Sequence, residues 1–137
     1  MKFKNKYGQV TLQHENNIII ASFSGYINES LMRDLSKELT KKIKALSGSP
    51  WGYISNSLAL EAATPEAEKN FIDLTTHMVK EGCIASTYVL GSTLVTNQMQ
   101  RIVKNSGLEL DIRDYMFNNL IEAKSYINAI MTEPTTY

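Results

Sequence analysis

The feature that most constrains this fold is an alternation between apolar stripes of helical period and short β-branched or aromatic runs. Beyond residue 28, four segments place apolar residues at three- and four-residue steps, the spacing of one face of an α-helix. In the first of them, Leu31, Leu35, Leu39 and Ile43 recur on one side, and lysines occupy the other. Helices that alternate with strands are typical of α/β domains with parallel crossovers.

The runs of β type predict five strands, at residues 8–15, 18–24, 51–57, 83–90 and 108–112. Asn16 and Asn17 form a short turn signal between the first two runs, which favours an antiparallel hairpin. We therefore expect one α/β domain with a mixed five-stranded sheet, four amphipathic helices and the order ββαβαβαβα. Its core spans about residues 8–131, and residues 132–137 form a flexible tail.

Polar residues mark where the four helices begin. Asn28 is a plausible first N-cap, Thr64 followed by Pro65 suits a second, and the run Gly91-Ser92-Thr93 opens a third. Asn118 or Asn119 caps the last helix. An anion could bind the N–H groups of the helix that Ser92 and Thr93 open, although a plain turn with a cap explains the same residues.

Composition narrows the classes of function. Of 137 residues, 43% are hydrophobic and 20% charged, which indicates a packed soluble protein. The 14 basic and 14 acidic residues cancel, which argues against a nucleic-acid partner. The run Ile18-Ile19-Ile20-Ala21 is the longest apolar one, far short of a membrane span. With a lone Cys83 and no signal-peptide pattern, we expect a cytoplasmic protein without disulfides.

No pattern in the chain predicts a metal site, a cofactor or a catalytic centre. His14 and His77 lie far apart, and neither has a Cys, Asp or second His at ligand spacing. His77 borders the apolar face of its helix, so we expect it at the surface or at the boundary of the core. No combination of nucleophile, base and orienting residue is recognisable. We therefore expect a non-catalytic protein.

Two segments resemble a known family. One is the strand, glycine and helix run IIIASFSGYINESLMRDLSKEL, and the other is residues 112–117 followed by the helix at 120–127. With the element order, they make the chain similar to the STAS domain of anti-sigma-factor antagonists (SpoIIAA-like proteins) over about residues 8–131. The sequence looks closer to an uncharacterised SpoIIAA-like branch, whose fold overlaps the lipid-binding CRAL-TRIO type.

The regulatory members of that family carry an Asp-Ser-Ser/Thr-Gly loop at the start of the second helix, where a partner kinase phosphorylates the hydroxyl. The corresponding residues here are 55–66, where the motif is absent and the loop is longer. The resemblance makes Ser57 and Thr64 the candidates for phosphorylation. Thr64 is also explained as an N-cap.

Ligands of open α/β sheets bind at the carboxyl ends of the strands. The candidate ligand- or partner-binding residues are therefore Ser24, Ser57, Leu58, Leu60, Thr64, Ser92 and Thr93. Leu58 and Leu60 belong to a partly apolar stretch, residues 58–63, that we expect to be a loop. This loop could be a lid, line a pocket, meet a second subunit or pack against the second helix.

Three functions stay open from the sequence. The first is a regulatory or interaction module that binds a protein partner, or itself as a homodimer, through the carboxyl-end loops and the first two helices. The alternative is a carrier of a small apolar ligand or lipid, which requires an enclosed pocket of roughly 300 Å³ or more. The third is a phosphorylation switch at Ser57 or Thr64.

Overall fold

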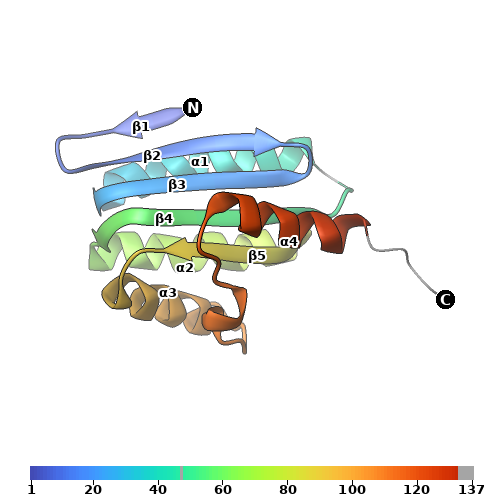
Figure 1. Ribbon diagram of the computed structural model, residues 1–137. Helices are drawn as coiled ribbons and strands as arrows, with labels where there is room; N and C mark the ends of the chain where they lie inside the picture. The colour runs from blue at the N-terminus through green and yellow to red at the C-terminus, as the bar shows by residue number, and fades with distance from the viewer. Residues whose placement is uncertain (47, 133–137) are drawn as a thin grey trace.

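A computed structural model describes residues 1–46 and 48–132 of the chain (Figure 1). The expected five-stranded sheet and four α-helices are present in this part of the chain. In chain order the elements are β1 (Lys2–Lys4), β2 (Gly8–Glu15), β3 (Ile18–Ile27), α1 (Glu29–Ala45), β4 (Trp51–Ala63), α2 (Pro65–Lys80), β5 (Cys83–Leu90), α3 (Thr93–Asn105), the 3₁₀ helix η1 (Ile112–Tyr115) and α4 (Leu120–Thr132). Of the tail expected at 132–137, all but Thr132 lies outside the described residues.

The strands lie side by side in the order β1-β2-β3-β4-β5. β1 and β3 both run antiparallel to β2, and the expected hairpin of β2 and β3 pairs Gly8 with Gly25 and Glu15 with Ile18. β3, β4 and β5 are parallel to one another. As a result, the carboxyl ends of three strands and the turn between β1 and β2 lie at the same end of the sheet, on the left in Figure 1.

Helices α1, α2 and α3 cover one face of the sheet, which we call the helix face. Side chains of a strand point alternately to the two faces of a sheet. In β2 and β3 the side chains on the helix face belong to one large core cluster and are Val10, Leu12, Ile19, Ala21 and Phe23. The apolar stripes predicted for the helices are buried here: Leu31, Leu35, Leu39 and Ile43 of α1 are at most 3% exposed. Burial of these stripes fixes which side of each helix meets the sheet.

The opposite face, which we call the α4 face, is covered only in part. Ala123 and Ile127 of α4 pack on Ile18, Ile20 and Ile54, near the amino ends of β3 and β4 (Figure 1). The helix approaches so closely that a Cβ atom added to Gly52 would lie 2.5 Å from the Cγ2 atom of Ile127. Gly52 is therefore the residue of β4 that lets α4 reach the sheet.

The predicted strand at residues 108–112 is wrong. Residues 108–111 have no regular structure, η1 follows them, and a single parallel bridge joins Met116 to Tyr88 of β5. Leu108 and Leu110 instead pack at the rim of the helix-face core, and the backbone carbonyl of Leu110 accepts a hydrogen bond from Gln100. The fifth strand of the sheet is β1, whose alternation Lys-Phe-Lys is too short to signal a strand.

The expected loop at residues 58–63 is also wrong, because β4 continues through it to Ala63. β3 likewise continues beyond residue 24, where the predicted strand ends, and pairs with β4 up to Ile27. The two strands keep contact through register shifts, one of them between Gly25 and Tyr26. Gly25 adopts φ 73°, a left-handed conformation that glycine reaches without strain, so the strand bends there without ending.

Candidate functional site

Three helices begin at the carboxyl end of the sheet, each with the N-cap that the sequence predicts. The side-chain oxygens of Asn28, Thr64 and Ser92 accept hydrogen bonds from the backbone N–H groups three residues further on, at 3.1, 3.2 and 3.2 Å respectively. Each cap satisfies one of the N–H groups that lack a partner in the first turn of a helix. These contacts hold the ends of α1, α2 and α3 at fixed places around the carboxyl end.

A polar cluster fixes α3 against α2 and β4. The side-chain amide of Gln98 binds the backbone N–H and C=O groups of Ala63 at 3.1 and 2.9 Å, and it also donates to Glu68 at 3.1 Å. The guanidinium of Arg101 donates twice to the carboxylate of Glu68, once from Nε at 2.9 Å. This hydrogen bonding from Arg101 holds the pKa of Glu68 below its ordinary value.

Four large apolar side chains are exposed on this half of the molecule: Tyr7, Tyr26, Leu58 and Leu94, which we call the docking surface. Their exposed fractions are 58%, 54%, 58% and 65%. The backbone N–H of Tyr26 donates to the carbonyl of Tyr7, and Gly91, just before α3, packs against the backbone carbonyl of Leu58. These backbone contacts link the β1–β2 turn to β3, and the end of β4 to the start of α3, so all four residues lie near the carboxyl end of the sheet.

The predicted site residues divide between this surface and the core. Ser92 and Thr93 are exposed at the start of α3, and Ser24 and Thr64 are half-buried. Leu60 is 4% exposed and belongs to the helix-face core, so within the stretch expected to be a loop it is a packing residue. Ser57 is fully buried, and its hydroxyl oxygen lies 3.0 Å from that of Ser55. Phosphorylation at Ser57 or Thr64 stays a prediction.

Sequence reasoning missed the polar cluster and most of the docking surface. The helical stripe of α3 is Val95, Met99, Ile102 and Val103, and Leu94 falls outside it. An apolar residue off the buried stripe is the one signal that could have identified Leu94 in advance. Gln98 carried no comparable signal, because only the folded chain brings it to Ala63, 35 residues away.

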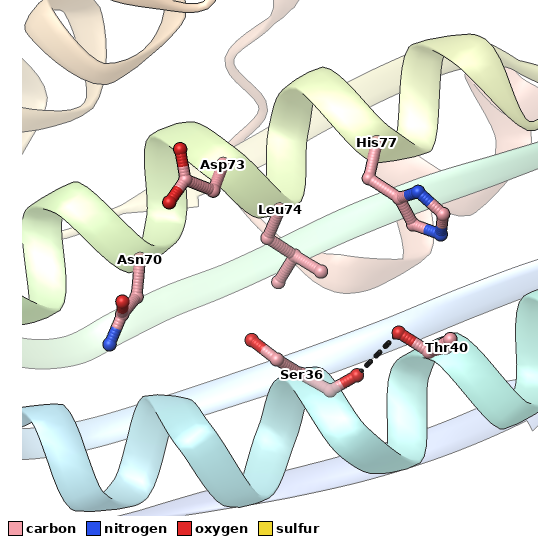
Figure 2. A pocket seen from close by; sticks show the side chains of 6 residues that line it. All are labelled: Ser36, Thr40, Asn70, Asp73, Leu74 and His77. Carbon is pink, nitrogen blue, oxygen red and sulfur yellow. Dashed lines mark hydrogen bonds between the residues drawn. The ribbon is translucent and has the colours of Figure 1, made fainter.

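A hollow lies between α1 and α2, on the side of the helices that faces away from the sheet (Figure 2). It holds about 260 Å³ and is lined by Ser36, Thr40, Asn70, Asp73, Leu74 and His77. The Thr40 hydroxyl donates to the backbone carbonyl of Ser36 at 2.7 Å. His77 is half-buried at the edge of this hollow, at the boundary position that the sequence predicts. Among the described residues, no three His, Cys, Asp or Glu side chains are grouped to hold a metal ion.

The interior of the helix-face core carries hydroxyl groups, but it leaves little room for a ligand. The void bounded by Tyr53, Ser55, Phe71, Thr75 and Tyr88, together with side chains of α2 and α3, holds about 10 Å³. That volume is about enough for one water molecule. Burial raises the pKa of the Tyr53 and Tyr88 hydroxyls and of the Cys83 thiol, so all three groups are neutral near pH 7.

Comparison with solved structures identifies the fold. The structure is similar to part of the SLC26A9 structure, with a TM-score of 0.61 and 14% identity over 86% of this chain and 21% of that one. It is also similar to the crystal structure of an anti-sigma factor antagonist from Mycobacterium paratuberculosis, with a TM-score of 0.56 and 14% identity over 87% of this chain and 92% of that one.

This chain therefore spans about a fifth of the SLC26A9 chain and almost the whole of the antagonist. No family model and no curated protein matches the sequence. Within residues 1–46 and 48–132, no helix is both long and apolar enough to cross a membrane. The structural matches confirm the resemblance drawn from the sequence: the chain has a STAS-like fold.

Proposed function

We propose that this protein is a non-catalytic interaction module that binds a protein partner through the docking surface. The observation that carries the proposal is the exposure of Tyr7, Tyr26, Leu58 and Leu94 on one half of the molecule. Large apolar side chains that are exposed near one another often mark a site where a partner binds, and aromatic residues are enriched at such sites. The similarity to an anti-sigma factor antagonist supports a regulatory role of this kind.

The surroundings of the docking surface suit recognition without a large rearrangement. Leu94 lies in the first turn of a helix whose start is held by Ser92 and whose middle is held by Gln98. Tyr26 lies on a strand that pairs with neighbours on both sides. Side chains on such ordered elements lose little further freedom on binding, which favours affinity.

The test compares charge substitutions at apolar positions that are all more than half exposed. Leu94→Asp and Tyr26→Asp place a charge within the docking surface, whereas Ile121→Asp does so on α4, where Ile121 is 76% exposed. We expect wild-type protein purified from its host to retain a partner protein in native mass spectrometry. Ile121→Asp should retain it too, and the two docking-surface variants should lose it. A wild-type protein that carries no partner, or equal retention by all variants, would contradict the proposal.

The interior of the protein does not favour the alternative function, a carrier of a small apolar ligand. The 10 Å³ void beneath β4 is far smaller than the roughly 300 Å³ that an enclosed site for such a ligand requires. The apolar stretch that suggested a carrier, residues 58–63, is a strand rather than a loop that could cover a pocket.

A further inference from the structure

The part of the α4 face that α4 leaves bare carries an ordered array of polar side chains. Strand pairing places Lys2, Thr11, Ser22 and Asn56 in one row across β1, β2, β3 and β4. A second row contains Lys4, Gln9, Ser24 and Ala59; it lies two residues away on β1, β2 and β3 and, because of a register shift, three residues away on β4. Neighbouring strands are about 4.8 Å apart, so each row spans roughly 14 Å from β1 to β4.

The place of these rows is unusual for a parallel sheet. Parallel strands are normally covered on both faces by the helices that connect them. Here β3 and β4 are parallel, yet α4 covers only their amino-terminal halves (Figure 1). The bare half is hollowed into a groove of about 220 Å³ lined by Gln9, Thr11, Ser22, Phe23, Ser24, Asn56, Leu58 and Ala59. A groove of that size suits a molecule of about one sugar ring rather than a drug-sized ligand.

The groove offers hydrogen-bonding capacity that the folded chain leaves largely unused. Asn56 donates to the Ser22 hydroxyl at 3.2 Å, and this is the one side-chain hydrogen bond among the lining groups in the described structure. The side chains of Gln9, Thr11 and Ser24 make none within the same residues. Uncharged amides and hydroxyls both donate and accept, which matches the hydroxyl groups of a polyol.

The positive charges of Lys2 and Lys4 favour a polyol that also carries a negative group. Lys2 and Lys4 are exposed and lie directly across from Thr11 and Gln9, on the same face of the sheet as the groove. Residues directly opposite in an antiparallel pair have Cβ atoms about 5 Å apart, so both ammonium groups can reach the β1 side of the groove. An ammonium group binds a phosphate through charge-assisted hydrogen bonds, which are stronger than neutral ones.

We propose that this groove binds a small polyhydroxylated molecule that carries a phosphate group, of which a hexose phosphate is the simplest example. Its hydroxyl groups bind Thr11, Gln9, Ser22, Ser24 and Asn56, and its phosphate binds Lys2 and Lys4. The exposed Leu58 contributes an apolar side chain at the far wall. The site needs no protein partner. It shares only Leu58 with the docking surface, and its test uses neither Leu94 nor Tyr26, so each of the two proposals can fail without the other.

The test is an NMR titration of ¹⁵N-labelled protein with glucose 6-phosphate, with glucose and with inorganic phosphate. We expect glucose 6-phosphate to give saturable shifts at the amides of both rows, and each of the other compounds to bind at least about tenfold more weakly. Lys2→Gln combined with Lys4→Gln should weaken binding of glucose 6-phosphate at least about tenfold, because it removes the charge-assisted bonds. Thr11→Val, which removes one hydroxyl and keeps the shape, should weaken it several-fold.

Lys37→Gln combined with Lys44→Gln is the matched charge control, because both residues are exposed lysines of α1 and lie away from the groove. It should leave the affinity unchanged. Inorganic phosphate that binds as tightly as glucose 6-phosphate would overturn the proposal, since exposed lysines alone would then explain the attraction. So would glucose that binds equally tightly, or an absence of saturable shifts up to about 10 mM ligand. The dispersion of each variant's spectrum shows independently that it is folded.

Discussion

The side-chain amide of Gln98 in α3 pairs with the backbone of Ala63 in β4 as a neighbouring strand would. The Ala63 N–H group donates to Oε1 of Gln98 at 3.1 Å, and Nε2 of Gln98 donates to the Ala63 carbonyl at 2.9 Å. β5 stops pairing with β4 at the Ser57–Leu90 pair, and β4 continues for six further residues. Gln98 thus satisfies backbone groups that the short β5 leaves without a partner, and it fixes α3 at the carboxyl end of the sheet.

Replacing Gln98 should destabilise the fold. In Gln98→Ala the Ala63 N–H and C=O groups lose their partners, which costs about 1–3 kcal/mol when the groups stay away from water. Urea unfolding measures this loss directly. Asn97→Ala is the control, because Asn97 is the residue of α3 just before Gln98 and its side chain is exposed. Equal unfolding midpoints for the two variants would show that the Gln98 contact contributes nothing to stability.

The ion pair of Glu68 and Arg101 should stabilise the fold near neutral pH and not in acid. The pKa of Glu68 is lowered in the folded state, so the folded chain binds its proton less readily than the unfolded chain does. The resulting stability is present above the ordinary pKa of a glutamate and is lost as the pH falls through the lowered value. Because the Arg101 side chain is 54% exposed, we expect only about 0.2–1 kcal/mol.

Urea unfolding of wild type and Glu68→Gln between pH 7 and pH 3 tests this expectation. The wild type should be the more stable of the two at pH 7, and the difference should shrink toward the acid end of the range. A difference in stability that stays constant over the whole pH range would show that the charge of Glu68 has no part in it.

Gly52→Ala should disturb the contact between β4 and α4. The added methyl group would lie 2.5 Å from Cγ2 of Ile127, whose side chain is fully buried, so α4 or the side chain must shift. Overpacking of this kind costs about 1–3 kcal/mol. Ile127→Leu removes the methyl branch at Cβ and keeps the volume, so in that background Gly52→Ala should cost less. Additive losses of unfolding free energy in this double-mutant cycle would rule out a direct clash.

Thr64 and Ser57 should respond in opposite ways to a negative charge. Thr64→Ala removes an N-cap and should cost about 1 kcal/mol, whereas Thr64→Asp keeps a capping oxygen and adds an anion at the helix N-terminus. We therefore expect Thr64→Asp to be nearly as stable as wild type. Ser57→Asp buries a charge at a fully enclosed position and should cost roughly 3–5 kcal/mol.

Thermal unfolding of the three variants and of Ser57→Ala compares these effects. A folded, stable Ser57→Asp variant would show that this side chain can reach water, and Ser57 would then remain as strong a candidate for phosphorylation as Thr64. A large loss in Thr64→Asp would show that the start of α2 does not accept an anion.

Local signals in the sequence were enough for the helices and for most of the sheet. The periodicity of Leu31, Leu35 and Leu39 predicted the buried side of α1, because burial requires one continuous apolar stripe. The N-caps Asn28, Thr64 and Ser92 were predictable because each contact spans only three residues of chain. Both segments predicted wrongly, residues 58–63 and 108–112, contain alternating apolar residues that fit more than one local structure.

By itself the sequence determined the α/β class, the helix starts, the hairpin and the resemblance to the STAS fold, because these depend on short-range patterns of polarity and capping. Only the tertiary structure decided which segment became the fifth strand, since pairing of Lys2–Lys4 depends on the register of β2. It alone aligned Lys2, Thr11, Ser22 and Asn56 from four strands into one row. Long-range pairing of this kind leaves no local trace, because the residues that meet are chosen by strand order and register and not by their neighbours in the chain.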